Sequence, residues 1–262
     1  MRKALLVVSF GTSHAETRKR TIEAIERDLH CAFPERRFYR AWTSGIIRKK
    51  IMEEEGVAID SVPDAMERML HDGIGDVLVQ PTHMMAGREY GKTENELFCW
   101  RSRFSHLCMG TPLLQERDDV RRLARVLESV FSGILPTDLL ALMGHGSADL
   151  EENPYELLTQ CFAADGYEQF CVGTVEHAPG LAPVMSMARE RNPGTIYLAP
   201  LMVVAGDHAL KDMAGTSKDS WQWQLRRCGF ETVSILKGIG EYEQVREIYV
   251  AHARRAETMQ NG

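Results

Sequence analysis

The sequence predicts an α/β protein made of two similar halves, each a doubly wound parallel sheet with helices on both faces. Three observations predict this fold. Short apolar runs that fit buried strands alternate with longer segments whose apolar residues have helical spacing. The alternation breaks near residues 132–136 and then starts again. Short motifs of the first half also recur, in the same order, in the second.

The first half opens with a continuous apolar run at residues 4–10 (ALLVVSF), typical of a strand buried on both faces of a parallel sheet. A Gly-Thr-Ser turn follows, and Ile22, Ile25 and Leu29 then recur at helical spacing. The same reasoning predicts further strands at 37–42, 77–80 and 106–109. It predicts helices at 16–29, 46–55, 63–71, 94–104 and 118–131.

The best linker candidate is the segment 132–136 (SGILP), because serine, glycine and proline interrupt regular structure. We therefore expect an N-terminal half at 1–131 and a C-terminal half at 138–262. In the second half, the pattern predicts strands at 139–143, 170–173, 195–199 and 232–236. It predicts helices at 154–164, 181–191 and 242–256, with helical material between 208 and 227.

The repeat rests on three pairs of segments. Residues 79–89 align with 198–208, because both have a strand, a proline, four mostly apolar residues, Ala-Gly and two polar residues. This alignment sets Glu89 opposite His208. Residues 9–13 align with 143–147, which sets Gly11 opposite His145, and residues 38–44 align more loosely with 170–176. The repeat predicts two similar flavodoxin-like halves that face each other across a cleft.

Composition excludes several classes of protein. The chain has 262 residues, a net charge of -6 and a pI of about 5.9, which argues against a nucleic-acid or anionic membrane surface. Six cysteines without a CxxC pair indicate reduced thiols, and no apolar run reaches the roughly 20 residues of a membrane helix. The first residues form a strand and no cleavage site follows, so we expect a cytoplasmic protein. Nucleotide-loop motifs are absent, so no organic cofactor is expected.

Candidate ligands follow three strands of the second half. His145 stands between two glycines after the first, Glu176 and His177 follow the second, and Asp207 and His208 follow the third. Neighbouring parallel strands lie about 4.8 Å apart, so residues beyond their carboxyl ends can meet over one crevice. Two imidazoles with one carboxylate suit a divalent ion such as cobalt, nickel, iron or zinc.

Structural alternatives exist for each candidate. His145 could belong to a simple strand-end turn, and His177 could cap or pack on the helix that follows. Asp207 and Ser147 are of the residue types that cap helix N-termini. His83, after a strand of the first half, could line the crevice or could be an ordinary packed histidine.

Several motifs together resemble the class II chelatases: LLVVSFGTS at 5–13, GHGS at 144–147, TVEH at 174–177 and PLMVVAGDH at 200–208. The resemblance is strongest to the anaerobic sirohydrochlorin cobaltochelatases of cobalamin biosynthesis and covers essentially the whole chain. It implies a chelatase-like fold and a lyase of tetrapyrrole (porphyrin-type) biosynthesis that inserts Co²⁺ into sirohydrochlorin, a relative of precorrin-2. Co²⁺ would be a substrate, and the same ligand set would accept Fe²⁺.

The resemblance also implies roles for individual residues. His145 and His208 would be metal ligands and catalytic residues, one of them also the base, with Glu176 as the acidic ligand between them. Glu89 would face the same cleft as a further catalytic residue. The strand-end turns would contact the tetrapyrrole through Phe10, Thr12, Ser13 and Ser147. Which histidine is the base stays open.

Two rival functions are kept. Iron insertion giving sirohaem would use the same ligands, and a non-catalytic metal or tetrapyrrole binding protein would use the same two-lobed shape. Substrate carboxylates would need basic partners, for which Arg88 and Lys92 are candidates. No nucleic-acid or membrane partner is expected. Amphipathic helices near both termini make a homo-oligomer possible.

Overall fold

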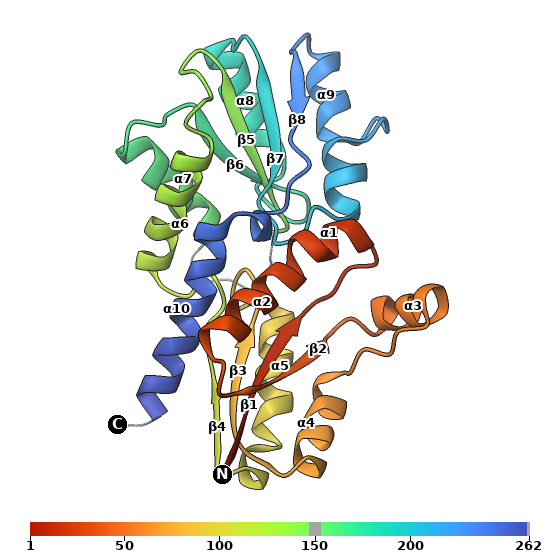
Figure 1. Ribbon diagram of the computed structural model, residues 1–262. Coiled ribbons are helices and arrows are strands. Elements are labelled where there is room, and N and C mark those ends of the chain that lie inside the picture. Colours follow the sequence, from red (N-terminus) through yellow and green to blue (C-terminus); the bar gives the residue numbers. More distant parts are fainter. Residues whose placement is uncertain (147–152, 261–262) are drawn as a thin grey trace. The chain divides into compact units, whose positions relative to one another are not determined.

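The computed structural model describes residues 1–146 and 153–260 (Figure 1). It consists of two compact units: unit 1 contains Met1–Gln115 and Glu243–Gly262, and unit 2 contains Glu116–Tyr242. Each unit holds one four-stranded sheet in which all strands are parallel. The predicted α/β class with two parallel-sheet halves is confirmed. Among the described residues, no helix is long and apolar enough to cross a bilayer.

Unit 1 has the strand order β2-β1-β3-β4. Alternate residues of β1 are buried on opposite faces, with Leu6 and Val8 in a core that also contains Met66 and Met69 of the helix α4. The strands are β1 (Arg2–Ser9), β2 (Arg37–Trp42), β3 (Ile74–Pro81) and β4 (His106–Met109). The helices are α1 (Ala15–Arg20), α2 (Ile22–Ala32), α3 (Gly45–Glu55), α4 (Val62–His71), α5 (Arg88–Phe98), the 3-10 turn η1 (Arg101–Arg103) and α10 (Glu243–Gln260).

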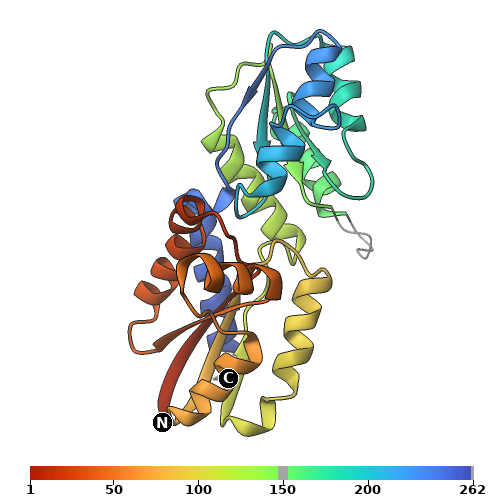
Figure 2. The same ribbon diagram turned by 90° about the vertical axis from the view of Figure 1, so that its right-hand side faces the viewer.

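Unit 2 repeats this plan with the strand order β6-β5-β7-β8 (Figure 1). Figure 2 shows the same chain turned by 90°. Its core joins Met143 and Leu198 of the sheet to Val184, Trp221 and Leu225 of the covering helices. The strands are β5 (Leu139–Gly144), β6 (Phe170–Thr174), β7 (Ile196–Pro200) and β8 (Thr232–Ser234). The helices are α6 (Arg117–Val130), α7 (Pro154–Ala164), α8 (Ala182–Arg191), the π-helix η2 (His208–Met213), α9 (Trp221–Arg227) and the 3-10 turn η3 (Ile239–Glu241).

The two units divide the chain differently from the predicted boundaries at 131 and 138. Helix α6, expected in the first half, belongs to unit 2 and packs against α7. Helix α10, expected in the second half, belongs to unit 1 and packs against α2, β3 and β4. The buried Arg36 ties α10 to the sheet, because its guanidinium donates to Glu257 at 2.8 Å and to Asp76 at 2.9 Å. Periodicity along the chain predicts such helices but not the sheet that they cover.

Three helix predictions differ from the structure. The helix expected at 16–29 is two helices, since Thr21 leaves the helical conformation (φ -115°, ψ -85°) and its hydroxyl donates to the Thr17 carbonyl at 2.6 Å. The helix expected at 94–104 begins earlier, at Arg88, and ends at Phe98. The helical material expected at 208–227 is divided into η2 and α9.

The structure shifts one alignment of the repeat by one residue. Phe10, rather than Gly11, is the counterpart of His145, and Gly11 corresponds to Gly146; these two glycines share positive φ values of 100° and 93°. Equivalent backbone bonds beyond the strand ends establish this register: Thr43 and Ser44 donate to Ser9 and Phe10 in unit 1, and Val175 and Glu176 donate to Gly144 and His145 in unit 2.

The alignment of 79–89 with 198–208 agrees with the structure. The Thr82 amide donates to Val8, as the Leu201 amide donates to Met143, at 2.8 Å in both cases. Glu89, in the first turn of α5, therefore corresponds to His208, the first residue of η2. The strand ends that carry His145, Glu176 and His208 in unit 2 thus carry Phe10, Ser44 and Glu89 in unit 1.

Candidate metal centre

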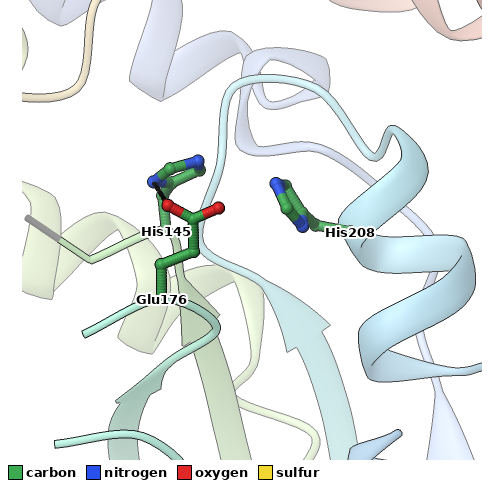
Figure 3. Close-up of side chains that lie close together, drawn as sticks. All are labelled: His145, Glu176 and His208. Carbon is green, nitrogen blue, oxygen red and sulfur yellow. Dashed lines mark ion pairs between the residues drawn. The ribbon is translucent and has the colours of Figure 1, made fainter. Parts of the chain in front are cut away.

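Three side chains of unit 2 converge at the carboxyl edge of its sheet: His145 after β5, Glu176 after β6 and His208 at the start of η2 (Figure 3). Each offers one ligand atom, and these atoms all lie within 4.8 Å of one another. The imidazole rings of His145 and His208 stand nearly perpendicular, with centroids 5.1 Å apart. Among the residues that the structure describes, no other group of His, Cys, Asp and Glu side chains meets this description.

Backbone geometry sets the distance between His145 and Glu176. The Glu176 amide donates to the His145 carbonyl at 2.8 Å, which continues the pairing of β5 with β6 beyond both strands. Gly146 is required at this point, because its φ is positive and an added Cβ would overlap the Glu176 carbonyl oxygen. The Nδ1 atom of His145 consequently lies 3.9 Å from Oε2 of Glu176.

The loop after β6 is closed by one threonine. The Thr174 hydroxyl accepts a hydrogen bond from the Gly180 amide at 2.9 Å and donates to the His177 carbonyl at 3.0 Å. His177 itself has a φ of 59°, in the left-handed region that non-glycine residues rarely adopt. This tight loop holds Glu176 above the strand end while its side chain remains half exposed to solvent.

A buried tyrosine supports the turn on the other side of His145. The Tyr155 ring fills the space in front of Gly144, where an added Cβ would lie 2.6 Å from the tyrosine Cζ. Burial raises the pKa of Tyr155 to about 12, and the nearby backbone N–H groups of Gly146 and His145 oppose this rise. The ring therefore fixes where β5 ends and the His145 turn begins. The sequence gives only a weak signal for this role, namely an aromatic residue in the first turn of the next helix.

His208 belongs to a short π-helix, in which the Ala214 amide donates to the Ala209 carbonyl at 3.1 Å. π-Helices are rare in proteins, and those that do occur are often found at functional sites. The Nδ1 atom of His208 lies 2.7 Å from Oδ2 of Asp212. A carboxylate at this atom holds the proton on Nδ1 and leaves the Nε2 lone pair for a metal ion or a proton.

Asp212 was not among the predicted site residues. Its only signal in the sequence is the spacing of four residues from a histidine, which places two side chains on the same side of a helix. Many such pairs occur without function, so the spacing alone identifies nothing. Only the structure shows the contact.

Two neighbouring candidates lie outside the cluster. His177 is exposed and is not among the three converging side chains. Asp207 stands at the N-cap position of η2, as its residue type indicated, but its side chain makes no capping hydrogen bond there. Its carboxylate instead pairs with Lys211 at 2.7 Å.

The predicted residues of the first half lie in unit 1. Phe10 is half exposed at its strand end, whereas Thr12 is buried and its hydroxyl accepts from the His14 amide at 3.2 Å. Ser13 and Glu89 are partly buried. Ser147 lies outside the described residues.

The histidine tautomers favour metal binding through Nε2. The Nδ1 atom of His145 lies 3.2 Å from the Gly146 carbonyl oxygen, an acceptor that favours a proton on Nδ1, as Asp212 does for His208. Two imidazoles and one carboxylate make three protein ligands, so a four- to six-coordinate ion would keep open positions. All three side chains are at least one-third exposed, so an ion could enter and leave. This donor set suits Co²⁺, Fe²⁺, Ni²⁺ or Zn²⁺.

Two parallel-sheet units with a strand-end cluster of two imidazoles and one carboxylate define an α/β protein with a candidate site for a divalent transition metal. Comparison with protein families is more specific. The model of the family described as "Cobalt chelatase (CbiK)" matches residues 3–258. The chain therefore belongs to the CbiK family of cobalt chelatases, and it is an enzyme of the chelatase (lyase) class, as predicted.

Curated relatives agree along the full length. The chain is 36% identical over 259 residues to the "Sirohydrochlorin cobaltochelatase" of Salmonella typhimurium, covering 99% of this chain and 98% of the relative. It is 28% identical over 259 residues to "Sirohydrochlorin cobaltochelatase CbiKC" of Nitratidesulfovibrio vulgaris, covering 97% and 90%. The predicted family is confirmed.

Solved structures support the fold. SirB from Bacillus subtilis with Fe³⁺ has a TM-score of 0.68 at 13% identity and covers 100% of this chain and 98% of that one. CbiX, the terminal enzyme for biosynthesis of sirohaem in denitrifying bacteria, has a TM-score of 0.56 at 19% identity, and the match covers 97% of this chain and 99% of that one. At these identities the likeness concerns the fold alone.

Proposed function

We propose that this chain inserts Co²⁺ into sirohydrochlorin in cobalamin biosynthesis. Membership of the cobalt chelatase family and the names of the curated relatives support this substrate pair. The observation that carries the proposal is the convergence of His145, Glu176 and His208, with ligand atoms within 4.8 Å of one another. A chelatase must hold a metal ion in exchangeable form, and this cluster offers three ligands at an accessible strand edge.

Metal insertion must also remove two protons. Each Co²⁺ that enters the tetrapyrrole replaces two pyrrole N–H protons, so the products are the cobalt complex and two protons. A histidine cannot bind metal and accept a proton on the same nitrogen at once. We assign the proton acceptor to His208, because the Asp212 carboxylate at its Nδ1 stabilises the imidazolium that forms. His145 and Glu176 would then keep the ion while His208 releases it.

Unit 1 supplies the remaining residues of the proposal. Glu89, the counterpart of His208, would accept the second proton. Phe10 would offer its half-exposed ring to a planar macrocycle and Ser13 its hydroxyl, while buried Thr12 shapes the turn. Ser147 remains a predicted contact. The exposed Arg88 and Lys92, in the first turns of α5, are candidate partners for substrate carboxylates.

The test is an anaerobic absorbance assay of cobalt insertion with purified full-length protein. His145→Ala and His208→Ala should each fold normally and lose insertion, by roughly 100-fold or more if the ion and its base act together. His177→Asn is the matched control, because His177 is exposed, lies next to Glu176 and is outside the cluster. Asparagine tolerates its left-handed backbone. Wild-type rates in both folded alanine variants would overturn the assignment.

The same assay separates the rival functions. A non-catalytic binding protein would stop at one equivalent of metal complex, whereas a chelatase continues with excess Co²⁺ and tetrapyrrole. Iron insertion giving sirohaem is tested by competition between Co²⁺ and Fe²⁺, since the donor set accepts both. A clear preference for Fe²⁺ would overturn cobalt as the substrate.

We also infer a cytoplasmic location, supported by six cysteines that are all free. A homo-oligomer stays a prediction, which light scattering of the purified protein would check. We also expect the protein to bind neither nucleic acid nor a membrane, and the acidic net charge supports this expectation.

A further inference from the structure

A partly buried histidine of unit 1 has no role in the proposal so far. His83 lies in the connection between β3 and α5, and its carbonyl accepts a hydrogen bond from the Leu113 amide at 2.9 Å. Both nitrogens of its imidazole are buried, and neither has a hydrogen-bond partner among the residues that the structure describes. A neutral imidazole carries one N–H donor and one acceptor, and leaving them unpaired in the interior costs free energy.

The first turn of α5 lies next to this ring. Tyr90 packs edge-on against the imidazole with ring centroids 6.3 Å apart, and Glu89 interacts with His83 electrostatically. Glu89 is partly buried and stands just after Gly87, the residue before the helix. The N-terminus of a helix favours an anionic side chain. Three side-chain torsions let its carboxylate turn toward the imidazole, whose N–H needs an acceptor.

Unit 2 shows that the fold does not require an imidazole at this position. The counterpart of His83 is Met202, whose carbonyl accepts from the Ile239 amide at 2.8 Å, as that of His83 accepts from Leu113. The packing position is therefore compatible with an apolar side chain. Unit 2 instead gives its strand-end base, His208, a polar partner in Asp212. By the same logic, His83 would be the partner of Glu89.

We propose that His83 is a positioning residue for Glu89, whose carboxylate it holds by a hydrogen bond from the imidazole N–H. This inference rests on the proposed function, in which Glu89 accepts a proton from the tetrapyrrole. Burial lowers the pKa of His83 to about 4, so the ring is neutral near pH 7 and donates without adding a charge. Such a bond fixes the direction of the carboxylate and leaves its second oxygen for the proton.

The kinetic test uses a double-mutant cycle in the cobalt insertion assay. His83→Met introduces the side chain that unit 2 has at this position, and His83→Gln keeps a donor. We expect His83→Met to lower kcat about 10-fold with KM for Co²⁺ within about twofold, the size expected for losing a hydrogen bond to a charged group. His83→Gln should recover most of the rate. The double variant with Glu89→Ala should be no slower than Glu89→Ala alone.

Several outcomes would overturn the inference. A kcat of His83→Met within twofold of wild type would do so. So would a double variant whose fold-loss in rate equals the product of the losses of His83→Met and Glu89→Ala. Binding of Co²⁺ without tetrapyrrole should be unchanged in all four variants, because the three converging ligands belong to unit 2. Weakened Co²⁺ binding in folded His83→Met would indicate a general structural role instead.

A spectroscopic measurement keeps the test independent of activity and of the folding of His83→Met. In the wild-type protein, ¹⁵N-edited NMR should show a slowly exchanging His83 ring N–H whose resonance moves in Glu89→Ala. An unchanged resonance would overturn the hydrogen bond. If wild-type protein failed to insert cobalt, the proposed function would fall, while this measurement would still decide the contact between His83 and Glu89.

Discussion

The Nδ1 atom of His208 and the Oδ2 atom of Asp212 lie 2.7 Å apart, four residues from each other around η2. This contact determines which nitrogen of His208 is available. It also fixes the rotation of the ring, because the imidazole cannot turn without losing a charge-assisted hydrogen bond. The Nε2 atom is left free, and the ring lies at the edge of the sheet where His145 and Glu176 also lie (Figure 3).

Replacing Asp212 should weaken metal binding without removing a ligand. Asp212→Ala is expected to reduce the affinity for Co²⁺ by about 10- to 100-fold, the effect of losing the carboxylate that orients a metal-binding imidazole. Isothermal titration at constant pH measures this. Asp207→Ala is the control, because it removes an exposed pair with Lys211 in the same π-helix. Equal affinities in the two variants would contradict the orienting role.

Gly146→Ala tests the backbone that sets the distance between His145 and Glu176. An added Cβ would overlap the Glu176 carbonyl, so the loop after β6 must move and Co²⁺ binding should fall at least about 10-fold. Gly166→Ala is a matched control, since Gly166 also has a positive φ but nothing lies within 4 Å of an added Cβ. Alanine is strained at a positive φ, so this strain should lower the free energy of unfolding of both variants by a similar amount, about 1 kcal/mol, as measured with urea. Undiminished binding in Gly146→Ala would contradict this account.

The sequence predicts those features that depend on neighbours along the chain. Apolar runs and helical periodicity give the strands and most helices, and α7 begins and ends as expected, because Asn153 caps it and Pro154 opens it. The three converging residues were also predicted, since each follows a strand and parallel strands end at one edge. The spacing of apolar residues predicts an element well where burial of one face alone determines which positions are apolar.

Other features depend on contacts between segments distant in the sequence. Helix α10 packs on unit 1 through contacts such as the pair of Arg36 with Glu257, 221 residues apart. Backbone hydrogen bonds to the neighbouring strand show that Phe10 is the structural counterpart of His145. The alignment of the two glycine-containing turns by sequence pairs His145 with Gly11 instead. Thr21 divides a helix through a local hydroxyl bond that does not interrupt the apolar spacing.

Removing the buried cation Arg36 should destabilise unit 1 strongly. Its side chain is 2% exposed and binds Asp76, Glu257 and the Ala4 carbonyl. Arg36→Met leaves the Asp76 carboxylate buried without its partner, which typically costs about 3 to 5 kcal/mol. Urea unfolding measures the loss, and hydrogen exchange should show early opening of α10. The control is Arg37→Met, whose guanidinium is 61% exposed and pairs with Asp72. It should cost less than about 1 kcal/mol, and equal losses would contradict the assignment.

His83, whose two ring nitrogens are buried, should make stability depend on pH. Burial lowers its pKa from 6.5 to about 4, so between these values the unfolded chain binds more protons than the folded one. Stability therefore falls as the pH falls through this window. Since one pKa unit corresponds to about 1.4 kcal/mol, His83 should cost about 2 kcal/mol between pH 7 and pH 5.

His83→Met removes this group, so its free energy of unfolding should fall less than that of wild type over the same range, by about 2 kcal/mol. Urea titrations of both proteins at pH 7, 6 and 5 measure the difference. His71→Asn is the control, because the His71 side chain is 91% exposed and its loss should leave the slope unchanged. Parallel pH profiles of wild type and His83→Met would mean that the imidazole binds a proton as readily in the folded protein as in the unfolded chain. That result would contradict the burial of both ring nitrogens.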